Sequence, residues 1–126
     1  MKNYAIIFAL MMLSLSCKKE TVSSAPWITK LDCSNTVAPP AKAGTPYLAQ
    51  NVYVRYEGGN GMPFEGRPGE ISTGVTGLTA NLHASTLGNG SGALVYTIAG
   101  TPSAPGMATF NISFSGQSCS FSLEVK

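Results

Sequence analysis

The sequence predicts an all-β domain, most simply an antiparallel β-sandwich of about seven short strands. The chain has 126 residues, which suits one domain. Its 14 glycines and 8 prolines provide frequent turns, and residues of high β propensity fill the segments between them. No helical hydrophobic period occurs after Leu15. A sandwich therefore accounts for the pattern best, and a small barrel is the alternative.

Residues 1–16 have the pattern of an export signal. Lys2 precedes an uncharged apolar stretch from Tyr4 to Leu15, which is shorter than the roughly 20 residues that cross a bilayer as a helix. The stretch is followed by the small residue Ser16 and then by Cys17. Cleavage after residue 16 is therefore expected.

The junction "LSLSCKKE" resembles the lipobox of bacterial lipoproteins. In that family the cysteine thiol and the new amino terminus carry acyl chains such as palmitate, so the resemblance implies lipidation of Cys17. The usual lipobox has Leu three residues before the cysteine, whereas Leu13 lies four before it. The ending "SCKKE" is nonetheless similar to the looser lipoboxes of Bacteroidetes. The alternative is an ordinary cleaved signal that leaves Cys17 as a free thiol.

Three cysteines in an exported chain leave one without a partner. Acylation of Cys17 removes that problem and leaves Cys33 and Cys119 to pair in an oxidising compartment. Two buried free thiols are the alternative. A metal site is the weaker interpretation, because the chain has no CxxC motif and its one histidine, His83, is distant from both cysteines in sequence.

Residues 17–26 are expected to form a polar tether that ends at Pro26, and residues 27–126 are expected to form the domain. "WITKLDC" predicts a first strand, with Leu31 and Cys33 on one face. "SNTVAPPAKAGTP" interrupts regular structure with its prolines.

Period-two alternation predicts the remaining strands. "NVYVRYE" is the clearest, followed by a turn at "GGNG". "GEISTGVTGLTANLHAS" predicts one or two short strands, and "GNGSG" predicts a turn before "ALVYTIAG". "TPSAPG" turns the chain into two final strands, "MATFNISFSG" and "QSCSFSLEV". The residues expected to face inward are Val52, Val54, Tyr56, Leu94, Tyr96, Ile98, Ala108, Phe110, Ile112, Phe114, Cys119, Phe121, Leu123 and Val125.

Residues 77–125 resemble the Ig-like modules of bacterial surface proteins, through "TGVTGLTA" and "IAGTPS" in particular. Similar repeats occur in secreted and surface proteins of Bacteroidetes. The resemblance implies an Ig-like sandwich that serves as a spacer, stalk or adhesive unit, and it carries no catalytic residues. The chain departs from the antibody order Cys, Trp, Cys, because Trp27 precedes both Cys33 and Cys119.

Charge and motif content narrow the function classes. Only 11% of residues are charged and the net charge is +2, so no nucleic-acid partner is expected. Catalytic motifs are not evident, since "GNGSGA" precedes a strand pattern rather than a helix and no G-x-S-x-G elbow is present. A hydrolase that uses His83 with Ser85 is a remote alternative. We expect no enzyme, no cofactor and no metal.

The irregular stretch of residues 57–70 is predicted to be a loop, and it is the loop with the most side chains suited to recognition. Tyr53, Arg55, Phe64 and Arg67 lie in or near it and offer aromatic faces and guanidinium groups to a surface glycan or a protein. The sequence thus predicts an exported lipoprotein of the cell envelope, held at the outer membrane, with a structural or adhesive role. A glycan- or protein-binding lipoprotein with its site on this loop is the alternative.

Overall fold

The computed structural model describes residues 25–126. The predicted export signal, Cys17 and the tether up to residue 24 lie outside the described residues. Residues 25–126 form ten β-strands and no helix. Within this part of the chain, no helix has the length and hydropathy needed to cross a membrane.

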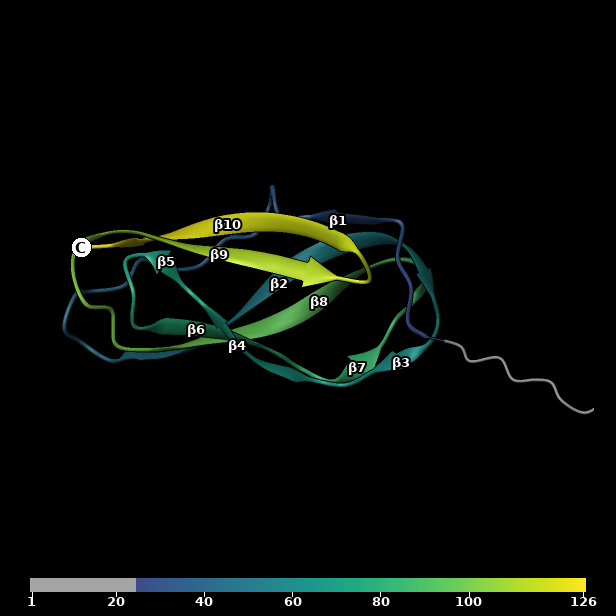
Figure 1. Cartoon of the computed structure of the whole chain (residues 1–126), viewed down its shortest axis with the longest axis horizontal. Helices are drawn as coiled ribbons and strands as arrows, with labels where there is room; N and C mark the ends of the chain where they lie inside the picture. The colour runs from purple at the N-terminus through teal and green to yellow at the C-terminus, as the bar shows by residue number, and fades with distance from the viewer. Residues whose placement is uncertain (1–24) are drawn as a thin grey trace, which may run out of the picture.

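Two antiparallel sheets face each other (Figure 1). The larger has the order β1-β2-β8-β6-β4, the smaller has the order β10-β9-β5, and β3 pairs with β7 at one end. The sheets do not close into a barrel, so the predicted sandwich is confirmed. Seven of the strands have three residues or more. The strands are β1 (Lys30–Asp32), β2 (Tyr47–Asn60), β3 (Pro63–Phe64), β4 (Arg67–Ile71), β5 (Thr73–Gly74), β6 (Leu78–Leu82), β7 (Ser85–Thr86), β8 (Asn89–Gly100), β9 (Gly106–Phe114) and β10 (Gln117–Val125).

The strand order is that of an Ig-like sandwich. Strands β1, β2, β8 and β6 take the places of A, B, E and D, and β5, β9 and β10 take those of C, F and G. Strand β4 directly precedes β5 in the chain, but it pairs with β6 on the opposite sheet. The C position is therefore divided between the two sheets, and only two residues of it pair with β9.

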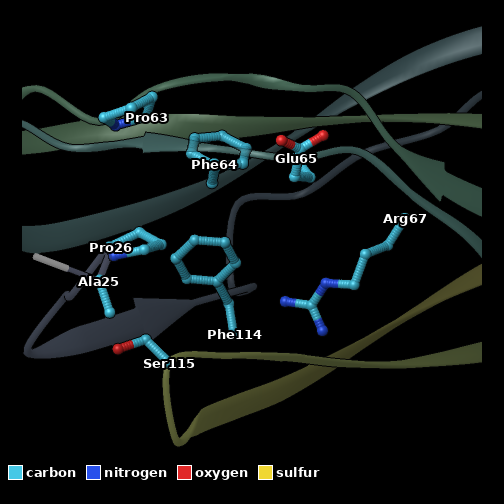
Figure 2. A pocket seen from close by; sticks show the side chains of 8 residues that line it. All are labelled: Ala25, Pro26, Pro63, Phe64, Glu65, Arg67, Phe114 and Ser115. Atoms are coloured by element: carbon cyan, nitrogen blue, oxygen red, sulfur yellow. The ribbon is translucent and has the colours of Figure 1, made fainter. Parts of the chain in front are cut away.

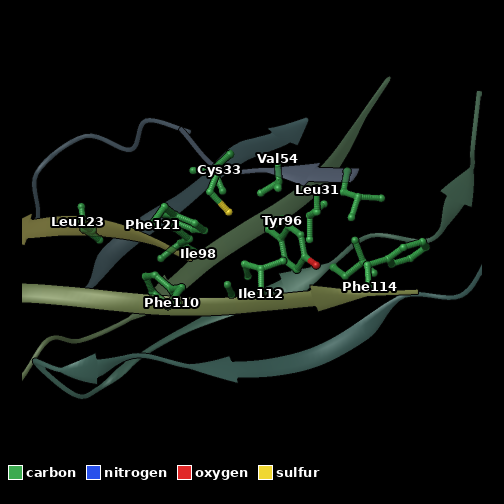
Figure 3. Packing of buried hydrophobic residues seen from close by; sticks show 14 of the residues in the cluster. Leu31, Cys33, Val54, Tyr96, Ile98, Phe110, Ile112, Phe114, Phe121 and Leu123 are labelled. Carbon is green, nitrogen blue, oxygen red and sulfur yellow. The ribbon is translucent and has the colours of Figure 1, made fainter. Parts of the chain in front are cut away.

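The core lies between the sheets and confirms the predicted alternation (Figure 3). Phe110 and Phe121 stack with ring centroids 5.2 Å apart. Of the residues expected to face inward, only Cys119 is half-buried, and it packs against the core. The fully buried members with the largest side chains are Phe110, Ile28, Leu78, Leu94, Ile98, Ile112 and Leu123.

Cys33 and Cys119 form a disulfide, as the cysteine count predicted. Their Cα atoms are 5.7 Å apart, which is typical of a disulfide, and their positions differ by 86 in the sequence. The bridge joins the segment after β1 to β10 and so links the first strand to the last. Antibody domains instead bridge strands B and F.

The turns predicted at "GGNG" and "GNGSG" were wrong, because β2 continues through Asn60 and β8 begins at Asn89. The strands stay paired there, with an irregularity between Tyr56 and Gly59. Glycines are needed at this place because a Cβ at Gly92 would overlap the buried Tyr56 hydroxyl. Residues 57–70 are likewise more regular than the predicted loop, since they hold the end of β2, all of β3 and most of β4.

We expect Gly92→Ala to lower the free energy of unfolding by about 1–3 kcal/mol, because it overfills a packed site. The added methyl would meet the Tyr56 hydroxyl, which accepts a 2.8 Å hydrogen bond from the Gly88 amide. Urea unfolding measures the change. The penalty should be smaller in a Tyr56→Phe background, and equal penalties in the two backgrounds would contradict this packing explanation.

Candidate functional site

An open pocket of about 480 Å³ lies at one end of the sandwich (Figure 2). It is bounded by the N-terminal segment, by β3 and the start of β4, and by the tip of the β9–β10 hairpin. Its lining is mainly apolar, with one acidic and one basic side chain. The lining residues are Ala25, Pro26, Pro63, Phe64, Glu65, Arg67, Phe114 and Ser115.

Phe114 is the centre of the pocket. The Phe64 ring meets it edge to face, with centroids 5.2 Å apart and an interplanar angle of 79°, a favoured geometry for aromatic pairs. The Arg67 guanidinium carbon lies 5.6 Å from the Phe114 centroid, within cation–π range. The three side chains form one aromatic and cationic surface, which we call the Phe114 cluster.

Strand ends position the cluster. Phe114 is the last residue of β9 and faces inward, just before a two-residue turn formed by Ser115 and Gly116. Both turn residues have positive φ, 53° and 79°, as a type I′ hairpin turn requires. Phe64 is held because β3 pairs with β7, and Arg67 begins β4.

The N-terminal segment is fixed at the rim of the pocket by Asn60. The side-chain oxygen of Asn60 accepts a hydrogen bond from the Trp27 amide at 3.2 Å, and its side-chain nitrogen donates to the Ala25 carbonyl at 2.9 Å. Ala25 therefore already contacts the domain, two residues before the predicted domain start at Trp27.

The four predicted binding residues do not form one site. Phe64 and Arg67 belong to the Phe114 cluster, whereas Tyr53 and Arg55 lie on the outward-facing side of β2. Tyr53 is 55% exposed, and Arg55 lies opposite Asp32 in the β1–β2 register. Alternation explains the separation, because these β2 side chains point away from the space between the sheets.

The pKa of Asp32 is lowered, chiefly by the hydrogen bond that its carboxylate accepts from the Ser34 amide at 2.8 Å. The charges of Lys30 and Arg55 lower it further. These contacts describe a local turn that follows β1 rather than a reactive carboxyl group.

Sequence reasoning placed Phe114 correctly in the core but did not assign it to a site. The available signal was its position as the last inward-facing residue before "SG", since an inward side chain at a strand end borders the open end of a sandwich. No comparable signal existed for Asn60, because its partners Trp27 and Ala25 lie 33 and 35 positions earlier in the chain.

His83 belongs to a hydrogen-bonded row across the outer face of the larger sheet. Its Nε2 contacts the Thr97 hydroxyl, which donates to the Asn51 side-chain oxygen at 2.7 Å. Ser85, the hydroxyl considered with His83 in the sequence, lies in β7 and is not part of this row.

Among residues 25–126 there is no cluster of three or more His, Cys, Asp or Glu side chains suited to hold a metal ion. Comparison with models of known protein families, with curated proteins and with solved structures finds no match for this chain. Function is therefore inferred from the fold, the pocket and the N-terminal sequence pattern.

Burial raises the pKa of Tyr96 to about 12. The charge of Glu70 raises this pKa further, and the charge of Arg67 opposes the shift. A tyrosine in the unfolded chain titrates near pH 10. At higher pH the unfolded state releases the Tyr96 proton before the folded state does, so the stability of the fold decreases as the pH rises from about 10 to about 12.

We expect Tyr96→Phe to make this loss of stability less steep, because the variant has no proton to release at that position. Burial also raises the pKa of Tyr47, so part of the slope should remain. Urea midpoints measured shortly after transfer to each pH provide the test. An unchanged slope in Tyr96→Phe would contradict the assignment.

Proposed function

We propose that this chain is a lipid-anchored protein of a bacterial envelope, whose Ig-like module has a non-catalytic, structural or adhesive role. The export pattern of residues 1–16 and the lipobox-like junction at Cys17 support the anchor. Two acyl chains on one terminus give stable membrane attachment, since each buried methylene contributes about 0.8 kcal/mol. The resemblance to surface modules of Bacteroidetes supports an outer-membrane location.

The observation that carries the proposal is where the chain enters the domain. Ala25 lies at the pocket end of the sandwich, and the C-terminus lies at the opposite end (Figure 1). Ala25 follows Cys17 by eight positions in the sequence, and eight residue steps span at most about 28 Å when fully extended. An acylated Cys17 would therefore hold the pocket end near the membrane and direct the other end away from it.

A second candidate function is recognition of a protein partner at the Phe114 cluster. The specific observation in its favour is an open apolar pocket with an exposed guanidinium group at its edge. Aromatic and arginine side chains dominate the energetics of many protein interfaces. Tyr53 and Arg55 lie on a separate surface, so a glycan site that combines all four predicted residues is not proposed.

We expect labelled palmitate to be incorporated into the full-length chain in a bacterium that processes lipoproteins, and to be absent from Cys17→Ser. The cysteine thiol is the acylated group, and serine does not replace it in that reaction. Gel autoradiography provides the measurement. Ser16→Ala is the matched control, because it keeps a small residue before Cys17, and it should retain the label. Equal labelling of Cys17→Ser would contradict the anchor.

A further inference from the structure

Strand β9 has an edge that is only partly covered. On one side it pairs with β10 along its whole length, from Gly106 to Phe114. On the other side β5 pairs only with Ala108 and Thr109. The chain before β5 belongs to β4, which pairs with β6 in the opposite sheet. Beyond Thr109, no described strand pairs with this edge of β9.

The hairpin geometry identifies which backbone groups face that edge. In a two-residue hairpin the residues that flank the turn, here Phe114 and Gln117, exchange backbone hydrogen bonds. Every second residue of β9 before Phe114 exchanges hydrogen bonds with its β10 partner in the same way. The backbone groups of the residues between them point away from β10. Met107 confirms this phase, because its carbonyl accepts a 3.1 Å hydrogen bond from the Val75 amide on the β5 side.

Asn111 and Ser113 have the same phase as Met107, so their N–H and C=O groups face the uncovered edge. These groups have no hydrogen-bond partner among residues 25–126. At the opposite edge of the sheet, Ala41 forms a parallel bridge with Val125 and its amide donates to the Glu124 carbonyl at 2.8 Å, so among the described residues that edge is covered only at the end of β10. The pocket distinguishes the β9 edge, because Asn111 and Ser113 belong to the strand that ends in Phe114.

Strand β4 lies close to β9 without pairing with it, and this part of β9 itself has none of the sequence devices that normally protect an open edge. Its exposed side chains, Asn111 and Ser113, are neutral and small, and the segment contains no proline, lysine or bulge. An edge of this kind accepts another polypeptide backbone, because only a strand presents donors and acceptors at matching intervals.

The Phe114 cluster lies at the end of the same edge. A strand added beside β9 would have alternate side chains facing the space between the sheets, and the residue opposite Phe114 is one of them. That side chain would enter the pocket beside Phe64 and Arg67 (Figure 2). The backbone edge and the pocket are separate observations, and both suit the same kind of ligand.

We propose that this end of the domain binds an extended segment of a partner polypeptide, which adds as a strand to the exposed edge of β9. The backbone of the segment pairs with Asn111 and Ser113, and one large apolar side chain fills the pocket at Phe64 and Phe114. This inference deepens the proposed recognition function and does not depend on the lipid anchor. Palmitate labelling tests the anchor and peptide binding tests the recognition site, so a failure of one leaves the other standing.

The test selects a phage-displayed library of random linear peptides against the full-length chain in detergent. We expect enriched peptides to contain alternating apolar residues and to bind Ser113→Pro about tenfold more weakly than the unmodified chain. Proline removes only the outward-facing amide of Ser113 and leaves the pairing with β10 intact. Fluorescence anisotropy of a labelled peptide gives the affinities.

The matched control is Ser120→Pro, the same substitution on β10, where the amide faces away from β9. It should bind within about twofold of the unmodified chain, since no recognised group is lost. If Ser113→Pro does not fold, hydrogen exchange of the unmodified chain decides instead, because the peptide should protect the Asn111 and Ser113 amides. Absence of enriched peptides, equal binding by Ser113→Pro, or unprotected amides would overturn the proposal.

Discussion

Removal of the Cys33–Cys119 bridge is expected to lower the free energy of unfolding by about 4.5 kcal/mol. The bridged residues are 86 apart in sequence, so the bond closes a loop that includes most of the domain. In the chain-entropy model, closing a loop of this length restricts the unfolded ensemble strongly. The free energy of unfolding of an ordinary domain is roughly 5–15 kcal/mol, so this loss would be a large share of it.

Urea unfolding of a Cys33→Ala/Cys119→Ala variant measures the effect. The control adds reductant to both proteins: the unmodified chain should lose stability and the double variant should not respond. Cys33 is buried and Cys119 half-buried, so the two substitutions also remove some packing. A double variant as stable as the oxidised chain would show that the bridge does not stabilise this fold.

Phe110→Ala is expected to cost about 3–5 kcal/mol, because it removes a fully buried ring from the centre of the core. The Phe110 side chain stacks on Phe121 from the neighbouring strand, with centroids 5.2 Å apart. Its loss leaves a cavity that the surrounding strands fill only in part.

The comparison variant is Phe64→Ala, because Phe64 is half-buried at the pocket. It should lose clearly less stability than Phe110→Ala when both are unfolded in urea, since less of its surface is buried. Equal losses would mean that the Phe114 cluster is as much a part of the core as the stacked phenylalanines.

The sequence was sufficient for the parts of the fold that alternation determines. The inward positions of β2, β8, β9 and β10 followed from a period of two residues, because each strand has one face on the core. The Cys33–Cys119 pairing followed from the odd number of cysteines and the expected oxidising compartment.

Other parts depended on contacts that a local pattern does not contain. "GGNG" and "GNGSG" have turn composition, yet they pair with each other because glycine leaves room for Tyr56 between the strands. Strands β3 and β7 have two residues each, which is too short for a periodic signal. The division of the C position between two sheets likewise depends on tertiary pairing.

The candidate site was predicted in part. Phe64 and Arg67 lie together as expected, but their partner Phe114 comes from a strand about 50 residues later in the chain. Tyr53 and Arg55 are close to them in sequence and lie on a different surface, because alternate residues of β2 face opposite ways. Proximity in sequence was therefore a poor guide to the composition of this pocket.

The anchor is the central claim, and the intact mass of the protein purified from bacterial membranes tests it most directly. We predict a chain that begins at Cys17, lacks residues 1–16 and has the added mass of acyl chains on its first residue. Inhibition of lipoprotein signal cleavage should leave residues 1–16 attached. A mature chain with an unmodified Cys17, or with a terminus elsewhere, would contradict the account.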